Sequence, residues 1–196
     1  MSAQRSRLRS RSPSPNNLKF TPTNIPDVIL IEPDVFRDAR GSFFEAYRRD
    51  LFQKNGIQTD FVQDNQSFSM KGALRGLHYQ ITPKEQAKLI RVVRGEVFDV
   101  VVDIRPGSRT FGRYVAETLS DKNRKMLFVP PGFAHGYLTL SDEAEFLYKV
   151  SELYSPLHER GLRWDDADLG IPWPKLDRPY LISDKDKLFP GLKDKK

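Results

Sequence analysis

The chain has 196 residues, of which 38% are hydrophobic, and it carries a formal net charge of +6 at neutral pH, which suits one domain with tails. It has no cysteine, which excludes a disulfide framework, a thiolate nucleophile and a cysteine-ligated zinc site. No run of 18 apolar residues occurs, so the sequence predicts no membrane span or membrane partner, and we expect a cytoplasmic location, with which the lack of cysteine is compatible.

The first segment, residues 1–17, is rich in Ser, Arg and Pro and contains no acidic residue. This composition predicts a disordered tail, although an organelle transit peptide or a basic arm for nucleic acid are alternatives. Residues 1–19 contain five basic residues, and the rest of the chain has 27 basic and 26 acidic residues. The body is therefore nearly neutral, and we expect no nucleic-acid partner for it.

Short apolar runs follow, and they alternate with turn residues. The best helix candidate spans residues 48–55 and ends at Gly56. Phe98, Val100, Val102 and Ile104 alternate along one face of a predicted strand, and Arg94-Gly95-Glu96 before it predicts a hairpin turn. Strands are predicted at residues 28–31, 88–93, 98–104, 114–119, 125–129, 136–140 and 145–150. Their spacing of about ten residues favours an all-β sandwich or jelly roll.

The predicted domain spans residues 18–190. Its last part, residues 156–190, is rich in proline and predicts irregular structure with short helices. Residues 191–196 are rich in Lys and Asp and predict a solvated C-terminal tail.

Two segments carry histidines in a recognisable pattern. Residues 74–80 place His78 three positions after Arg75 on a predicted strand, and residues 130–135 fit the Pro-x-Gly-x-x-His pattern of the second cupin motif, which ends at His135. A metal-binding cupin has a His-x-His pair and a Glu in its first motif, but here Tyr79 and Gln80 follow His78. We therefore predict no metal, so that the histidines are free for acid–base work, with a structural role in the core as the alternative.

A histidine base needs a carboxylate that orients its ring. The sequence alone does not choose among six candidates, which are Asp99, Asp103, Asp165, Asp166, Asp184 and Asp186. Tyr148 suits either a core aromatic or an acid. Lys88 and Arg75 interrupt apolar strand patterns, where a charge must meet water, a counter-ion or an anionic ligand.

Taken together, eight ordered blocks between Ile25 and Pro190 resemble the dTDP-4-dehydrorhamnose 3,5-epimerase family, the RmlC-like cupins. The blocks are residues 25–28, 38–41, 61–65, 74–80, 95–100, 131–136, 146–149 and 183–186. The resemblance implies an all-β cupin jelly roll with a few short helices, a homodimer, a dTDP-4-keto-6-deoxy sugar as substrate and no cofactor.

The resemblance also implies residue roles. His78 corresponds to the catalytic base, Asp186 to its dyad partner, Tyr148 to the acid on the opposite sugar face and Lys88 to the cation at the enolate oxygen. Tyr154 falls where the family stacks an aromatic ring on thymine. The implied substrate-binding residues, some of which reach across a dimer interface, are Arg40, Glu45, Gln63, Asn65, Arg75, His135, Tyr154, Glu159 and Lys185.

The implied reaction is epimerisation at C3 and C5 of dTDP-4-dehydro-6-deoxy-D-glucose to dTDP-4-dehydro-L-rhamnose, in dTDP-L-rhamnose biosynthesis. The alternatives are an epimerase acting at one centre, a 3,4-ketoisomerase on the same class of sugar, and a non-catalytic sugar-nucleotide-binding cupin.

Overall fold

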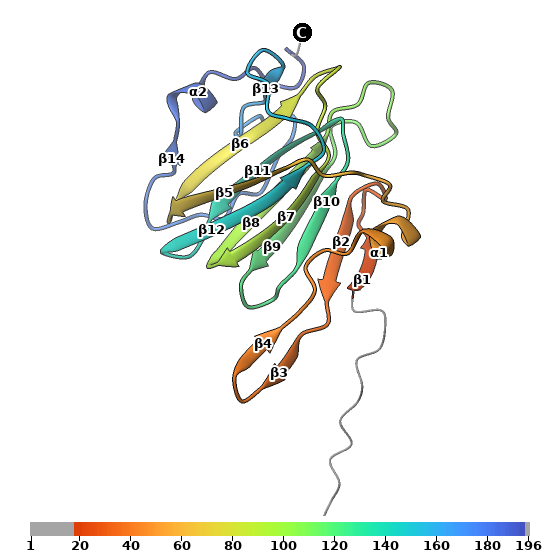
Figure 1. Ribbon diagram of the computed structural model, residues 1–196. Helices are drawn as coiled ribbons and strands as arrows, with labels where there is room; N and C mark the ends of the chain where they lie inside the picture. Colours follow the sequence, from red (N-terminus) through yellow and green to blue (C-terminus); the bar gives the residue numbers. More distant parts are fainter. Residues whose placement is uncertain (1–17, 195–196) are drawn as a thin grey trace, which may run out of the picture.

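The computed structural model describes residues 18–194, which form two facing antiparallel sheets (Figure 1). In spatial order, the first sheet contains β1 (Leu18–Pro22), β2 (Ile29–Pro33), β10 (Met126–Val129), β7 (Lys88–Arg94), β12 (Glu143–Val150) and β5 (Gln63–Met70). The second contains β13 (Glu159–Gly161), β6 (Ala73–Gln80), β11 (Phe133–Thr139), β8 (Glu96–Asp103) and β9 (Tyr114–Ser120). The predicted all-β jelly roll is confirmed.

Five smaller elements complete the described chain. A separate hairpin of β3 (Phe36–Asp38) and β4 (Gly41–Phe43) projects from the body (Figure 1), and β14 (Leu181–Ile182) pairs in parallel with β6. The helices are α1 (Arg49–Lys54), close to its predicted place, and α2 (Asp184–Lys187). No helix within residues 18–194 is long and apolar enough to cross a bilayer.

The main core lies between the two sheets, and β8 is buried on both of its faces. Val97 and Val101 point into the core between the sheets, whereas Val100 and Val102 point outward. The outward side chains pack with residues of the C-terminal segment, among them Leu162, which covers the outside of the second sheet. The predicted shared face of β8 is therefore confirmed, and it faces this C-terminal cover.

The predicted hairpin turn at Arg94-Gly95-Glu96 is wrong, because β7 and β8 belong to different sheets. Gly95 turns the chain from one sheet to the other with φ of +80°, and a Cβ atom there would lie 2.1 Å from the Glu143 carbonyl oxygen. Glycine tolerates both the positive φ and the lack of space, because it has no Cβ atom. Alternating strands on either side of a glycine fit a corner as well as a hairpin, so the sequence pattern did not distinguish them.

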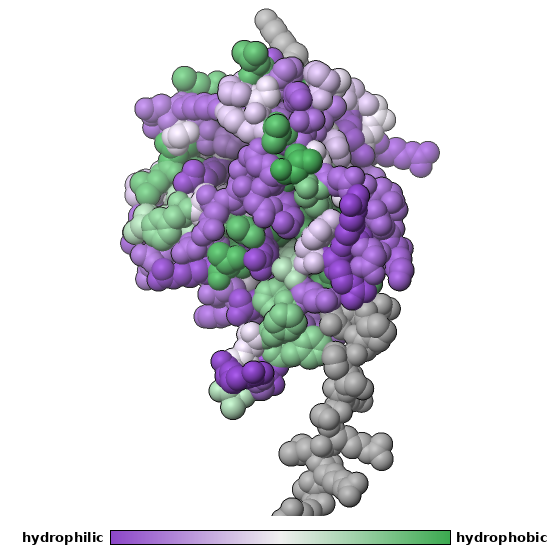
Figure 2. All heavy atoms as spheres, viewed as in Figure 1, coloured by the Kyte–Doolittle hydropathy of each residue, from purple (hydrophilic) through white to green (hydrophobic). Residues whose placement is uncertain are grey.

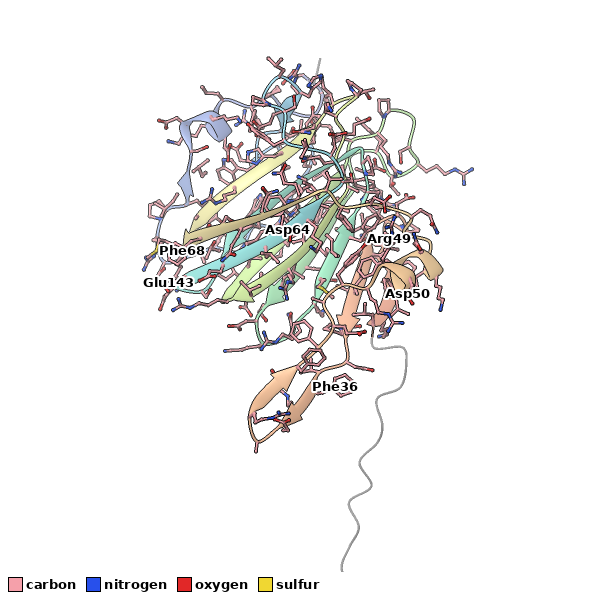
Figure 3. All side chains as sticks on the ribbon, in the orientation of Figure 1. Phe36, Arg49, Asp50, Asp64, Phe68 and Glu143 are labelled. Atoms are coloured by element: carbon pink, nitrogen blue, oxygen red, sulfur yellow. The ribbon has the colours of Figure 1, made fainter. Side chains whose placement is uncertain are left out.

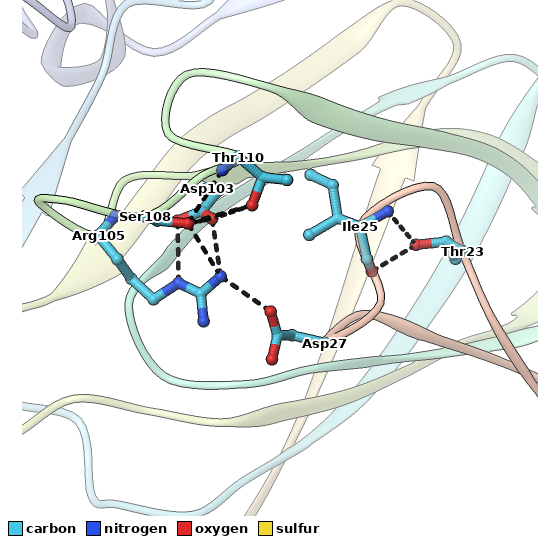
Figure 4. A network of polar contacts seen from close by, with 7 residues as sticks. All are labelled: Thr23, Ile25, Asp27, Asp103, Arg105, Ser108 and Thr110. Atoms are coloured by element: carbon cyan, nitrogen blue, oxygen red, sulfur yellow. Dashed lines mark hydrogen bonds and ion pairs between the residues drawn. The ribbon is translucent and has the colours of Figure 1, made fainter.

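The loop between β8 and β9 is organised by a buried carboxylate, shown in Figure 4. Asp103 accepts hydrogen bonds from the Arg105 guanidinium and from the hydroxyls of Ser108 and Thr110, and Arg105 also contacts Asp27. Burial by itself would raise the pKa of Asp103, but these hydrogen bonds hold it well below its usual range. Asp103 is thus part of a hydrogen-bond network that stabilises the loop.

The C-terminal end corrects the predicted solvated tail at residues 191–196. Leu192 is buried in the cluster outside the second sheet, and its backbone N–H donates to Asp166 at 2.6 Å. Packing therefore extends past residue 190, whereas Lys193 is exposed. The predicted disordered tail at residues 1–17 lies outside the described residues, as do residues 195–196.

Candidate active site

A cavity of about 190 Å³ opens between the two sheets. Both sheets and the segment after β12 contribute to its lining, which consists of Ser67, Arg75, His78, Tyr79, Gln80, Gln86, Lys88, His135, Tyr137, Phe146, Tyr148, Tyr154 and Glu159. Seven of the predicted site residues are among them, namely Arg75, His78, Lys88, His135, Tyr148, Tyr154 and Glu159.

His78 is paired with Asp186, although 108 positions separate them in the sequence. His78 Nε2 lies 2.8 Å from Asp186 Oδ1, and the Gly76 backbone N–H donates to Oδ2 of the same carboxylate at 3.2 Å. Burial would raise the pKa of Asp186, but the hydrogen bond and charge of His78 lower it overall. The structure thus selects Asp186 among the six carboxylates that the sequence left open.

The chain reaches this pairing through the short parallel strand β14. Leu181 pairs with Ala73 and Ile182 with Leu74 of β6, and α2 follows directly. Ser183 caps this helix by accepting a hydrogen bond from the Asp186 N–H. The strand that carries His78 therefore also anchors the segment that carries its partner.

Lys88 enters the cavity from β7 and is only 7% exposed. Its Nζ donates to the His78 carbonyl oxygen at 3.3 Å. Burial lowers the pKa of Lys88 to about 8, although the charges of Asp99 and Glu159 oppose this shift. A cation of this kind suits the stabilisation of a developing negative charge, because a fixed charge interacts more strongly in a buried environment than in water.

Tyr148 lies on β12 of the first sheet, whereas His78 lies on β6 of the second. The two side chains therefore enter the same cavity from opposite walls. Burial raises the pKa of Tyr148 above its usual value of 10.0. The phenol is consequently protonated at neutral pH and can act as a proton donor.

His135 forms a second buried histidine–carboxylate pair. Its Nε2 lies 2.9 Å from Asp99 Oδ2, and the Asp99 side chain is fully buried. Burial lowers the pKa of His135, against the opposing charge of Asp99. The sequence analysis missed this role of Asp99; its position on the inward face of β8, between Val97 and Val101, was the available signal.

Arg75 lies at the edge of the cavity and is held by the neighbouring strand. Its Nε donates to the Ser69 hydroxyl at 3.0 Å, and its Nη2 donates to the Phe68 carbonyl at 3.2 Å. Phe68 itself is exposed on β5 (Figure 3). These bonds aim the guanidinium while leaving donors available for an anion.

A polar chain surrounds Tyr154 at the mouth of the cavity. The Tyr154 hydroxyl donates to Glu159 at 2.7 Å, and Lys185 forms an ion pair with the same carboxylate. The Tyr154 backbone N–H donates to Gln63, whose own amide donates to Asn65 at 2.7 Å. Five predicted binding residues are thereby connected within one group.

Arg40 and Glu45 are not brought to the cavity within this chain. Arg40 lies at the β3–β4 turn and pairs with Asp38 at 2.7 Å, whereas Glu45 lies 3.5 Å from Arg48. Within residues 18–194, no group of three or more His, Asp or Glu side chains is arranged to hold a metal ion.

Comparison with known proteins identifies the family. The sequence model of the dTDP-4-dehydrorhamnose 3,5-epimerases matches residues 22–194. The chain belongs to this family. Curated relatives of that name from Pseudomonas aeruginosa and Shigella flexneri are each 53% identical, over 87% and 84% of this chain and 93% and 90% of their own lengths. The family resemblance of the sequence blocks is thus confirmed.

Solved structures agree with this placement. The dTDP-6-deoxy-D-glucose-3,5-epimerase of Legionella pneumophila, in complex with dTDP-4-keto-L-rhamnose, superposes with a TM-score of 0.87 at 43% identity, covering 90% of this chain and 94% of that one. A 3'-monoepimerase from Streptomyces bikiniensis in complex with dTDP-quinovose superposes with a TM-score of 0.82 at 37% identity, covering 88% and 87%. The fold is therefore shared by epimerases with different numbers of reacting centres.

The environment of Lys88 predicts an unusual titration. We expect its ammonium to titrate near pH 8 because it is buried, whereas an exposed lysine titrates near about 10.4. NMR titration of the lysine Cε and Nζ signals measures this directly. Asp99→Asn removes a charge that favours the ammonium and should lower the value further. A Lys88 signal that titrates above pH 10 would contradict the assignment.

Proposed function

We propose that this protein epimerises C3 and C5 of dTDP-4-dehydro-6-deoxy-D-glucose and yields dTDP-4-dehydro-L-rhamnose. The observation that carries the proposal is the placement of the His78–Asp186 pair and Tyr148 on opposite walls of one cavity that also contains Lys88. A base and an acid on opposite faces of a sugar ring are what inversion of a carbon centre requires. Membership in the epimerase family supports the same conclusion.

The C4 ketone of such a sugar acidifies the hydrogens at C3 and C5. A base removes one hydrogen as a proton, the electron pair moves onto O4 as an enolate, and an acid returns a proton to the other face of the carbon. The ketone serves as the electron sink in each inversion. In this proposal His78 accepts the proton from the carbon, and Tyr148 donates a proton to the other face. Tyr148 can donate because burial raises its pKa and keeps it protonated at neutral pH.

Asp186 determines which nitrogen of His78 reacts. With Nε2 donating to the carboxylate at 2.8 Å, the neutral ring carries its lone pair on Nδ1. Nδ1 then accepts the proton from the sugar, and the carboxylate stabilises the imidazolium that forms.

Lys88 has the position and charge to stabilise the enolate oxygen. Its ammonium lies in a buried environment where a fixed charge interacts more strongly than it would in water. Loss of one such donor typically costs about 2.7–4 kcal/mol of transition-state stabilisation. The lowered pKa of Lys88 also predicts that this cation is lost in alkaline solution.

The nucleotide half of the substrate would be held by the group at the mouth of the cavity. Tyr154 is 54% exposed, and its ring would be available for stacking on thymine, which is worth about 1–3 kcal/mol per base. Arg75 and His135 would contact the diphosphate and the sugar, with Gln63, Asn65, Glu159 and Lys185 around the base and ribose. Binding energy from these remote groups orients the sugar at the reacting atoms.

The first alternative, epimerisation at one centre, is favoured by one specific observation, the similarity to a 3'-monoepimerase. NMR of the substrate and purified protein in D₂O distinguishes the two. We expect deuterium at both C3 and C5 of the product, because each inversion replaces a carbon-bound hydrogen with one from solvent. Label at one carbon only would contradict double epimerisation, and movement of the carbonyl from C4 to C3 would indicate a ketoisomerase.

Replacement of the base tests the proposal against a non-catalytic binding protein. His78→Asn should lower kcat by at least about 100-fold, the usual contribution of a general base, whereas dTDP binding should be largely retained. Unchanged turnover would overturn the assignment of the base.

A matched pair of variants on α2 serves as a control for this experiment. Asp186→Asn should lower kcat because it removes the carboxylate that orients His78. Asp184→Asn, on the same helix, changes a side chain that is 96% exposed and pairs only with Lys187 among its described partners, so it should leave activity unchanged.

We further propose that the active unit is a homodimer in which Arg40 and Glu45 serve the partner's cavity. The β3–β4 hairpin projects from the body, and Figure 2 shows hydrophobic side chains where it joins the body. Phe36 on this hairpin (Figure 3) is 37% exposed and Phe43 is 67% exposed, so both rings have apolar surface that a second copy could cover.

Mixed dimers test this arrangement. Arg40→Ala and His78→Asn should each be nearly inactive alone, but mixing and reassociating them should restore activity. Random exchange makes half of the dimers mixed, and each mixed dimer has one intact site out of two. About a quarter of the wild-type activity should therefore return in an isologous dimer. No recovery from subunits shown to exchange would indicate that Arg40 does not act across the interface.

A further inference from the structure

We propose that Gln80 is a positioning residue that fixes Tyr154 for the nucleotide and links it to the strand of the catalytic base. This inference rests on the proposed function, because it takes Tyr154 as the residue that stacks on the thymine of the nucleotide. The sequence pattern gave Gln80 no role of its own; it only showed that no second histidine follows His78 and ended the block at residues 74–80.

The Gln80 carboxamide is buried and makes three hydrogen bonds to the backbone. The side chain is only 5% exposed. Its Nε2 donates to the Lys84 carbonyl at 2.5 Å and to the Leu153 carbonyl at 3.3 Å, and its Oε1 accepts from the Ser155 N–H at 2.7 Å. A glutamine amide offers two donors and one acceptor oxygen, so each of these groups is used.

Two of these bonds are to the residues on either side of Tyr154, namely Leu153 and Ser155. Gln80 thus holds the peptide groups that flank the residue. Gln63 holds the Tyr154 N–H at 3.2 Å, and Glu159 holds its hydroxyl. Tyr154 as a whole is about half exposed, so the direction of its ring depends on these polar bonds and on the backbone more than on packing.

Other bonds hold the two ends of this segment, and after Tyr154 the Ser155 carbonyl accepts from the backbone N–H groups of His158 and Glu159. Ala87 and Ser151 exchange hydrogen bonds, and the Gln86 amide donates to the Glu152 carbonyl at 2.7 Å. The carboxamide of Gln80 continues this attachment across Leu153 and Ser155. Its loss would therefore loosen the part of the segment that carries the ring.

The same side chain connects the nucleotide loop to the chemistry. Gln80 follows His78 by two residues on β6, and residues with this spacing point to the same face of a strand. The strand thereby fixes the Tyr154 segment relative to the catalytic base, His78. A stacked ring held in place contributes to affinity because less conformational freedom is lost when the ligand binds.

The experiment measures dTDP affinity, KM and kcat for Gln80→Met and Gln80→Glu. Methionine matches the length but removes every hydrogen bond, and glutamate places a carboxylate against the Lys84 and Leu153 carbonyls. Both should weaken dTDP binding and raise KM by about five- to tenfold, within the range expected when stacking is impaired, with kcat changed by less than about twofold. Gln58→Met is the matched control, because Gln58 is exposed and bonds only to Gln53 among its described partners.

A double-mutant cycle with Tyr154→Ala decides whether Gln80 acts through the ring. In the Tyr154→Ala background, Gln80→Met should have little further effect on dTDP affinity. Fully additive effects, or a fall in kcat without a change in KM, would overturn the inference. Failure of the unmodified protein to bind dTDP would instead overturn the proposed function.

A measurement on the unmodified protein covers the case in which the variants do not fold. Amide exchange of Ser155 should be slowed, because its N–H donates to a buried carboxamide oxygen. Exchange as fast as in an unstructured peptide would show that Gln80 does not hold the segment and would overturn the inference.

Discussion

The catalysis that we propose depends on the bond between His78 and Asp186 more than on any other contact. The carboxylate comes from the last helix of the described chain and the imidazole from the middle of a central strand, so the pair forms only when the whole domain has folded. A two-residue parallel strand aligns the partners, and the Gly76 N–H occupies the second carboxylate oxygen. Without this bond the Asp186 carboxylate would lose the main interaction that offsets the cost of burying its charge, and the imidazole would lose its fixed orientation.

Buried charge is distributed through the rest of the cavity in a way that would serve the proposed proton transfer. Burial lowers the pKa of Lys88 to about 8, so the ammonium is still the main form at neutral pH, and the charge of Asp99, which is also the partner of His135, opposes this shift. Its pKa is lower in the folded chain than in the unfolded chain, so Lys88 opposes folding below about pH 8, and this cost disappears as the pH rises through the unfolded value. A site that retains such a cost in the folded state fits a group needed for chemistry rather than for stability.

The sequence predicted the fold class and most of the strands, because alternation over β8 and regular spacing are local features. It did not separate a corner from a hairpin at Gly95, since that difference lies in which strands pair. The residue patterns alone left the partner of His78 open, and the family resemblance supplied Asp186. The burial of Leu192 and the pairing of Asp99 with His135 were missed, because both depend on contacts between distant segments.

In the proposed mechanism the site separates into a rigid wall for chemistry and a polar mouth for recognition, and β6 belongs to both. His78 is held by packing and by a buried carboxylate, whereas Tyr154 is exposed and held by amide groups. Hydrogen bonds at an exposed mouth compete with water, so each contributes little on its own. Several acting on neighbouring peptide groups can nevertheless restrict the direction of one ring, and this makes a buried carboxamide on the base-carrying strand an effective link between nucleotide binding and the placement of the sugar.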